Sequence, residues 1–152
     1  MKHAGLWAIG IGALVSAGSL TVEQARSSDQ GGPTSCSNAT LRGLYMSSTN
    51  GYQSTTPSLV PIAVTAKDTF YGNGHFDSLA TISIGGTIIR NDVAPGTYTV
   101  NSDCTATAII HMMPPTPDVH LQWFVAPDGD QIFSTETDPG TVLTCRLQEV
   151  AL

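Results

Sequence analysis

The sequence predicts an all-β domain, and three observations lead to that prediction. From residue 36 onward, short runs that alternate apolar and polar residues are separated by Gly, Pro, Asn and Asp. No window of helical length has a clean helical period. Charged residues make up only 12% of the chain while Ser, Thr, Gly and Pro are frequent, and this composition favours strands and turns. The 152 residues suffice for one domain with its own core.

The expected strands are short and numerous. Each has strand-favouring residues at alternating positions. They lie at residues 41–48, 59–66, a segment ending at Ile84, 87–92, 97–100, 104–112, 119–126, 131–137 and 141–150. Turns or loops are expected between them at residues 50–57, Lys67-Asp68, Gly85-Gly86, Pro95-Gly96, 101–103, Asp128-Gly129 and Pro139-Gly140.

Most of these connections are short enough to join antiparallel neighbours. A sheet of that kind must close on itself or fold into a sandwich to remove its exposed edges. Hairpin signals link sequential strands without long crossovers. We therefore predict an antiparallel up-and-down barrel of eight or nine strands, with a β-sandwich as the alternative.

The first segment of the chain has the pattern of a signal peptide. Lys2 gives it a positive start, residues 4–15 are apolar, and small residues lead up to Ala17. The apolar run is shorter than the roughly 20 residues that a membrane helix needs. We predict a cleaved signal peptide over residues 1–17, a disordered leader over 18–35 and a barrel domain over 36–152. The protein is then secreted or periplasmic, with no stable membrane span after cleavage.

Three cysteines permit at most one intramolecular bridge in an oxidising compartment. The preferred pair is Cys36 with Cys104, because it would tie the start of the domain to the sheet. Spacing leaves Cys104 with Cys145 as an open alternative. Cys145 alternates with Leu143 and Leu147, so a buried, unreactive thiol is expected there.

Several segments of the domain resemble recurring segments of a group of uncharacterised exported bacterial proteins. They include a C-x4-L-x-G-x-Y segment at 36–45, a G-T-Y-T-V-N-x-D-C-T segment at 96–105, and the segments 72–77 and 136–140. The resemblance covers residues 36 to 145. In that group the first cysteine pairs with the one before Thr105, which implies the Cys36–Cys104 bridge. The corner and hairpin segments are also similar to those of allene oxide cyclase and lipocalin-like barrels, a likeness of fold that implies little about activity.

Motifs for catalysis or for a cofactor are not found. His111 and His120 could share a rim of the sheet with Asp118 or Asp77, but their spacing matches no short metal-ligand pattern, so no metal site and no cofactor are predicted. There is no G-x-S-x-G nucleophile elbow, and nothing decides whether the protein is an enzyme. The formal charge of −6 without a basic cluster argues against nucleic acid as a partner. The sequence specifies no oligomeric state.

Large apolar residues fall on both faces of the later strands. One face can fill a core, and the surplus has two interpretations. It packs under a loop or against a partner, or it forms a cavity or rim patch for a ligand, since a barrel of eight strands is just wide enough to hold one small ligand. The leading hypothesis is therefore a binding barrel for a small, largely apolar molecule. Its expected lining residues are Tyr45, Met112, Trp123 and Phe133. The alternatives are an allene oxide cyclase-like cyclase or isomerase, and a structural or cell-surface interaction module without catalysis.

Overall fold

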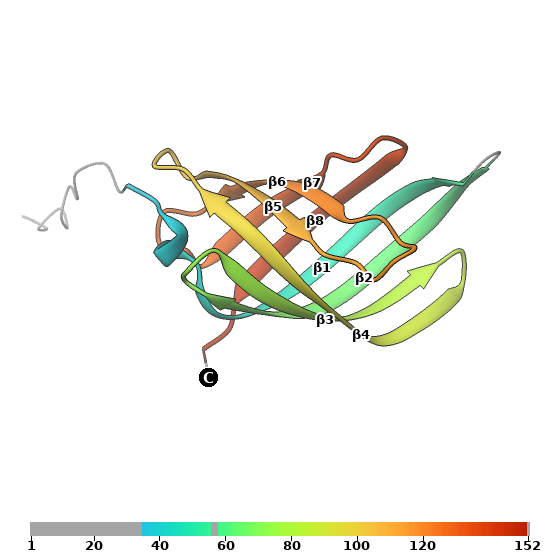
Figure 1. Ribbon diagram of the computed structural model, residues 1–152, viewed down its shortest axis with the longest axis horizontal. Coiled ribbons are helices and arrows are strands. Elements are labelled where there is room, and N and C mark those ends of the chain that lie inside the picture. Colours follow the sequence, from blue (N-terminus) through green and yellow to red (C-terminus); the bar gives the residue numbers. More distant parts are fainter. Residues whose placement is uncertain (1–34, 56–57, 152) are drawn as a thin grey trace, which may run out of the picture. The chain divides into compact units, whose positions relative to one another are not determined.

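The computed structural model describes residues 35–55 and 58–151, which form a closed barrel of eight antiparallel strands (Figure 1). The strands follow one another around the barrel in chain order, and the last pairs with the first. This confirms the predicted up-and-down barrel, and the sandwich does not form. The strands are β1 (Arg42–Thr55), β2 (Ser58–Tyr71), β3 (His75–Ile84), β4 (Thr87–Val100), β5 (Thr105–Ile110), β6 (Val119–Val125), β7 (Gln131–Glu136) and β8 (Thr141–Glu149).

Two of the predicted segments lie in the part of the chain that the structure does not describe. The predicted signal peptide, residues 1–17, lies outside the described residues, and so does the predicted leader, 18–35, apart from Ser35. Within the described ranges, no helix has the length and apolar character needed to cross a membrane.

The predicted tight turns at Gly85-Gly86 and Asp128-Gly129 are confirmed. Gly85 and Gly86 join β3 to β4 with φ values of 56° and 89°, in the left-handed region where glycine is favoured. Gly129, with φ of 83°, lies in the turn between β6 and β7. These hairpins keep consecutive strands adjacent, and this adjacency allows a simple meander to close into a barrel.

Two predicted interruptions of the chain are wrong because a glycine was interpreted as a turn. Asn50 and Gly51 lie inside β1, where Gly51 lets the backbone of β8 approach closely at Val142. Pro95 and Gly96 lie inside β4. A Cβ atom on Gly96 would collide with the Phe76 ring, so this glycine makes room for an aromatic side chain within the strand.

The turn predicted at Lys67-Asp68 is also wrong. Strand β2 continues to Tyr71, and Asp68 pairs with Ser78 of β3 in the middle of the ladder. Its side chain is only 4% exposed, on the same face as Val64 and Ala66. A buried carboxyl group therefore takes the place of the expected surface turn.

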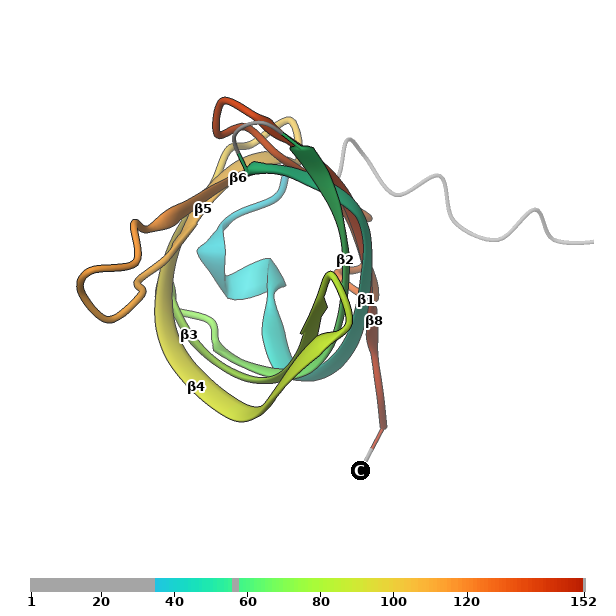
Figure 2. The ribbon, with the colours of Figure 1, turned by 90° about the vertical axis from the view of Figure 1, so that its right-hand side faces the viewer.

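One end of the barrel is closed by residues 35–41, which include the 3-10 turn η1 (Asn38–Thr40). Figure 2 looks along the barrel and shows this segment lying across its far end. Leu41 is fully buried, and the Tyr98 hydroxyl lies 3.0 and 3.1 Å from the carbonyl oxygens of Asn38 and Leu41. The Asn38 side-chain oxygen accepts a 2.8 Å hydrogen bond from the Val100 amide. We call residues 35–41 the plug.

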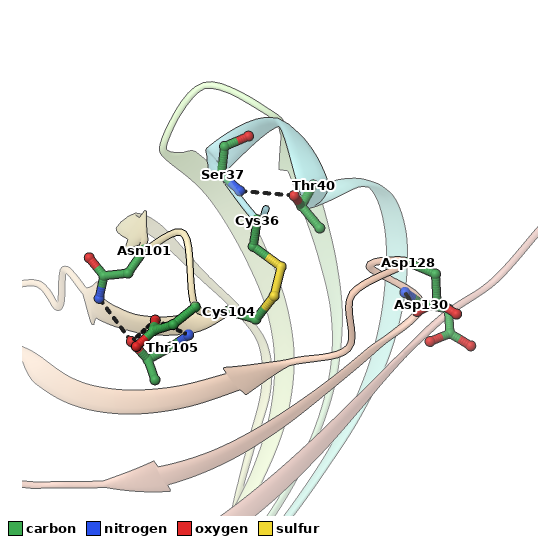
Figure 3. The surroundings of a disulfide bond; sticks show 9 residues. Cys36, Ser37, Thr40, Asn101, Cys104, Thr105, Asp128 and Asp130 are labelled. Atoms are coloured by element: carbon green, nitrogen blue, oxygen red, sulfur yellow. Dashed lines mark hydrogen bonds between the residues drawn. A yellow bond between two sulfur atoms is a disulfide. The ribbon is translucent and has the colours of Figure 1, made fainter. Parts of the chain in front are cut away.

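A disulfide ties the plug to the sheet. Cys36 forms a disulfide with Cys104, with 5.0 Å between their Cα atoms (Figure 3). The Cys36 amide also donates a hydrogen bond to the Ser102 carbonyl. This confirms the preferred pairing and excludes Cys104 with Cys145. Thr105 anchors the same turn through bonds to Asp103 and Asn101.

Above the plug, the interior is filled by a layer of five aromatic side chains. Phe70 packs on the Phe76 ring at 5.1 Å and meets Trp123 at 5.8 Å, in geometries that aromatic pairs favour. The layer consists of Tyr45, Phe70, Phe76, Tyr98 and Trp123. These side chains are buried and form the centre of the hydrophobic core.

Candidate functional site

The other half of the barrel is hollow. A cavity of about 230 Å³ lies between the aromatic layer and the end of the barrel opposite the plug, where the β3–β4 hairpin lies (Figure 1). Most of the surface of the cavity is apolar, and aliphatic side chains from β2, β3, β5, β6 and β8 form much of its wall. They include Ile62, Val64, Ile82, Ile110, Leu121 and Leu143.

A band of polar side chains surrounds the deep end of this cavity. Six neighbouring strands, β3, β2, β1, β8, β7 and β6, contribute one residue each. They are Ser78, Asp68, Ser47, Cys145, Ser134 and Trp123, and we call them the polar belt. Direct cross-strand pairing joins Asp68 to Ser78, and it joins Trp123, Ser134 and Cys145 in series. Ser47 connects the two groups, since its side chain interacts with both Asp68 and Cys145.

The belt has a titratable centre at Asp68. Burial raises the pKa of this carboxyl, and hydrogen bonds with Ser78 and Ser47 oppose the shift only in part. Burial likewise raises the pKa of the Cys145 thiol, and the charge of Asp68 raises it further. Hydrogen bonds with Thr49 and Ser47 oppose this shift. The thiol is therefore held in its neutral, unreactive form, as the sequence suggested.

Two atoms of the belt have no hydrogen-bond partner among the described residues. These are the indole N–H of Trp123 and the hydroxyl of Ser134, on side chains that are 1% and 5% exposed. Buried polar groups are nearly always paired, because an unpaired donor costs about 1–3 kcal/mol. Both residues line the cavity, but these two atoms have almost no accessible surface, so they lie within the packed wall and do not face the open space.

The mouth of the cavity is bordered by the connection between β5 and β6. Met112 and Thr116 of this connection line the cavity. Asp118 accepts a 3.0 Å bond from the Met112 amide and lies 3.0 Å from His111 Nδ1. The other ring nitrogen of His111 lies 3.2 Å from Thr97 Oγ1. These contacts of His111 and Asp118 hold the β5–β6 connection in place at the mouth of the cavity.

His120 does not line the cavity. His120 bonds the carboxylate of Asp138 through its amide at 2.7 Å and its Nδ1 at 2.8 Å. These bonds lower the pKa of Asp138, the backbone bond contributing most. In the described parts of the chain, no group of three or more His, Cys, Asp and Glu residues is placed to hold a metal ion.

The four residues expected to line the cavity lie in different places. Met112 and Trp123 do line it, from the mouth and from the deep end. Tyr45 is buried in the aromatic layer, where its hydroxyl bonds the Gly129 carbonyl. Phe133 is 51% exposed on the outside of the barrel, with the Arg146 guanidinium 5.5 Å from its ring centre.

Sequence reasoning missed Asp68, Ser78 and Ser134 as cavity residues. Each lies in phase with apolar residues of its strand: Asp68 follows Val64 and Ala66 at the same spacing of two. A charged or hydroxyl residue in phase with an apolar face therefore indicates a polar group inside the barrel. For Asp68, the turn predicted at Lys67-Asp68 hid this pattern.

Comparison of the chain with protein-family models, with curated proteins and with solved structures finds no match.

Proposed function

We propose that this protein binds a small, largely apolar molecule inside its barrel. The observation that carries the proposal is the cavity of about 230 Å³ between an aliphatic wall and the aromatic layer. It is larger than the apolar cavity of ~150 Å³ that binds benzene in an engineered core, and smaller than the ~300 Å³ at which sites for drug-sized ligands begin. The ligand is therefore a compact molecule.

The site of action in this proposal is outside the cytoplasm. The Cys36–Cys104 disulfide fits an oxidising compartment. With the signal peptide predicted for residues 1–17, it supports a secreted or periplasmic protein. An interaction module needs no cavity, so the hollow interior gives that alternative no support.

A cyclase or isomerase is the second candidate, favoured by Asp68. A buried carboxyl with a raised pKa inside an apolar cavity is suited to proton transfer during a rearrangement. An enclosing cavity can also hold a substrate in its reactive conformation. Formation of a product from a candidate substrate, lost in Asp68→Asn, is the measurement that supports this candidate.

The binding proposal is tested by filling the cavity. Ala66 lines it from β2, while Ala63 of the same strand faces outward. We expect the uncharged dye N-phenylnaphthylamine to bind the full-length protein saturably, with a rise in fluorescence. Ala66→Phe should abolish this binding, and the matched Ala63→Phe should leave it unchanged.

Circular dichroism verifies that both variants are folded, and Ala80→Phe fills the cavity from β3 if Ala66→Phe does not fold. Absence of saturable dye binding to the parent protein contradicts the proposal. Dye binding that survives in a folded, cavity-filled variant contradicts it equally.

A further inference from the structure

A hydroxyl, an imidazole and a carboxylate form a chain of hydrogen bonds on the outside of the barrel. Thr97 Oγ1 of β4 lies 3.2 Å from His111 Nε2, and His111 Nδ1 lies 3.0 Å from Asp118 Oδ2. His111 and Asp118 belong to the connection between β5 and β6. The same order of groups occurs in the serine hydrolase triad, where the imidazole acts as general base toward the hydroxyl. Both distances are within the reach expected of a nucleophile, its base and the group that orients the base.

The carboxylate sets the direction of each hydrogen bond. Hydrogen bonds with His111, and then with the Met112 amide, lower the pKa of Asp118, so its carboxyl group is ionised and can only accept. Nδ1 of His111 must therefore carry the proton in its bond to Asp118. In the neutral imidazole this leaves Nε2 as an acceptor, and the Thr97 hydroxyl donates to it. A hydroxyl that donates to a neutral imidazole is the arrangement that general-base activation requires.

The three side chains face solvent and not the cavity. Tyr98 belongs to the aromatic layer inside the barrel, so the preceding residue of β4, Thr97, has its side chain on the outer face. Thr97 is half-buried, and the side chains of His111 and Asp118 are 41% and 40% exposed. None of the three lines the cavity. The chain of bonds therefore forms a second site, separate from the proposed binding cavity.

We propose that Thr97, His111 and Asp118 form an acyl-transfer site that cleaves small, reactive carboxylic esters. Thr97 Oγ1 forms a bond to the ester carbonyl carbon while its proton passes to His111 Nε2. The bond between that carbon and the leaving oxygen then breaks, and His111 gives the proton to the leaving oxygen or to water. A water molecule that loses its proton to the same nitrogen hydrolyses the acyl group from Thr97 and restores the hydroxyl. This activity goes beyond the proposed binding function and does not depend on it.

The surroundings of the nucleophile restrict the class of ester. Threonine is a secondary alcohol, and its methyl group crowds the attacking oxygen. On the outer face Thr97 is flanked by its cross-strand partners, His75 of β3 and Ile109 of β5. These features favour a short acyl group. Because the site is open to water, an ester with a weakly basic leaving oxygen is the substrate that needs the least stabilisation from the protein.

The probe is p-nitrophenyl acetate, added to the full-length protein. We expect release of p-nitrophenol together with an acetyl group on the peptide that contains Thr97, identified by mass spectrometry. Thr97→Val keeps the shape of the side chain and should abolish this acetylation. Thr97→Ser keeps the hydroxyl without the methyl group, and its acetylation should be at least as fast. Acetyl groups found only on other side chains, or none at all, overturn the proposal.

Asp118→Asn tests the orientation of the imidazole. The Asn carbonyl oxygen still accepts from the Met112 amide, so its NH₂ group faces His111 Nδ1 and leaves the ring proton on Nε2. That nitrogen can no longer accept from Thr97, and acetylation should fall at least about tenfold. The matched control is His120→Gln, which removes the other histidine–carboxylate pair and should leave acetylation of Thr97 unchanged.

Circular dichroism verifies that each variant is folded. Undiminished acetylation of Thr97 in folded Asp118→Asn overturns the role of the carboxylate, and an equal loss in His120→Gln overturns the assignment of the base. If Asp118→Asn does not fold, the comparison of Thr97→Val with Thr97→Ser still decides whether Thr97 is the nucleophile. Dye binding in the cavity is measured separately, so failure of the acyl-transfer site is distinguishable from failure of the proposed function.

Discussion

Removal of the Cys36–Cys104 bridge tests how the plug is held on the closed end of the barrel. The double substitution Cys36→Ser and Cys104→Ser opens a loop closed over a sequence separation of 68. The loop-entropy relation assigns such a closure a stabilisation of about 4 kcal/mol at room temperature. This is a large share of the ~5–15 kcal/mol by which domains of this kind are stable.

The assay is equilibrium unfolding in urea, followed by circular dichroism. The midpoint should fall by roughly 2–3 M and the thermal midpoint by roughly 15 °C. Cys145→Ser is the control, because it removes a thiol that forms no bridge and should shift the midpoint far less. A loss below about 1 kcal/mol in the double variant would refute the reasoning that the bridge fastens the plug.

Two further predictions concern single residues. Burial raises the pKa of Asp68, so the folded protein keeps the carboxyl proton to higher pH than the unfolded chain, in which this pKa is near 3.8. The stability that this proton contributes is fully present in acid and is lost as the pH rises through the pKa of the folded state. Asp68→Asn should therefore be more stable than the parent at neutral pH, with the difference shrinking toward pH 3.8, and urea midpoints that show the opposite trend would contradict the assignment. Gly129→Ala would place a Cβ against the Thr40 carbonyl of the plug, at a φ of 83°, and should cost about 1–3 kcal/mol. Gly86→Ala, at a similar φ of 89° with open space around it, is the matched control and should cost less, so equal losses would contradict the contact with the plug.

The barrel could be predicted because its signals are local. Alternation marks strands one at a time, and glycine pairs such as Gly85-Gly86 mark tight hairpins. Antiparallel neighbours then follow from short connections. Strand lengths were harder to predict, because the contacts that require a glycine at positions 51 and 96 lie on other strands. Gly51 admits the backbone of β8, and Gly96 admits the ring of Phe76.

The existence of a cavity was predicted, but only two of the four residues expected to line it, Met112 and Trp123, do so. Met112 and Trp123 stood out because they are large and apolar. The polar residues of the site did not, because the side chains that partly compensate the burial of Asp68, Ser78 and Ser47, lie on neighbouring strands. Phe133 shows the converse difficulty: its ring lies outside against Arg146, and the sequence gives no sign of that packing. Two faces of one strand can both be apolar, and only closure of the barrel decides which is inner.

The most direct test of the central proposal is a methyl NMR titration of the full-length protein with phenethyl alcohol. Ile82 and Leu121 report from the cavity wall, while Leu59 and Val93 report from exposed positions. The methyl signals of Ile82 and Leu121 should shift saturably and together, and those of Leu59 and Val93 should stay in place. Shifts confined to the exposed methyl groups, or no saturable shift at all, would contradict the proposal that the interior of this barrel is a binding site.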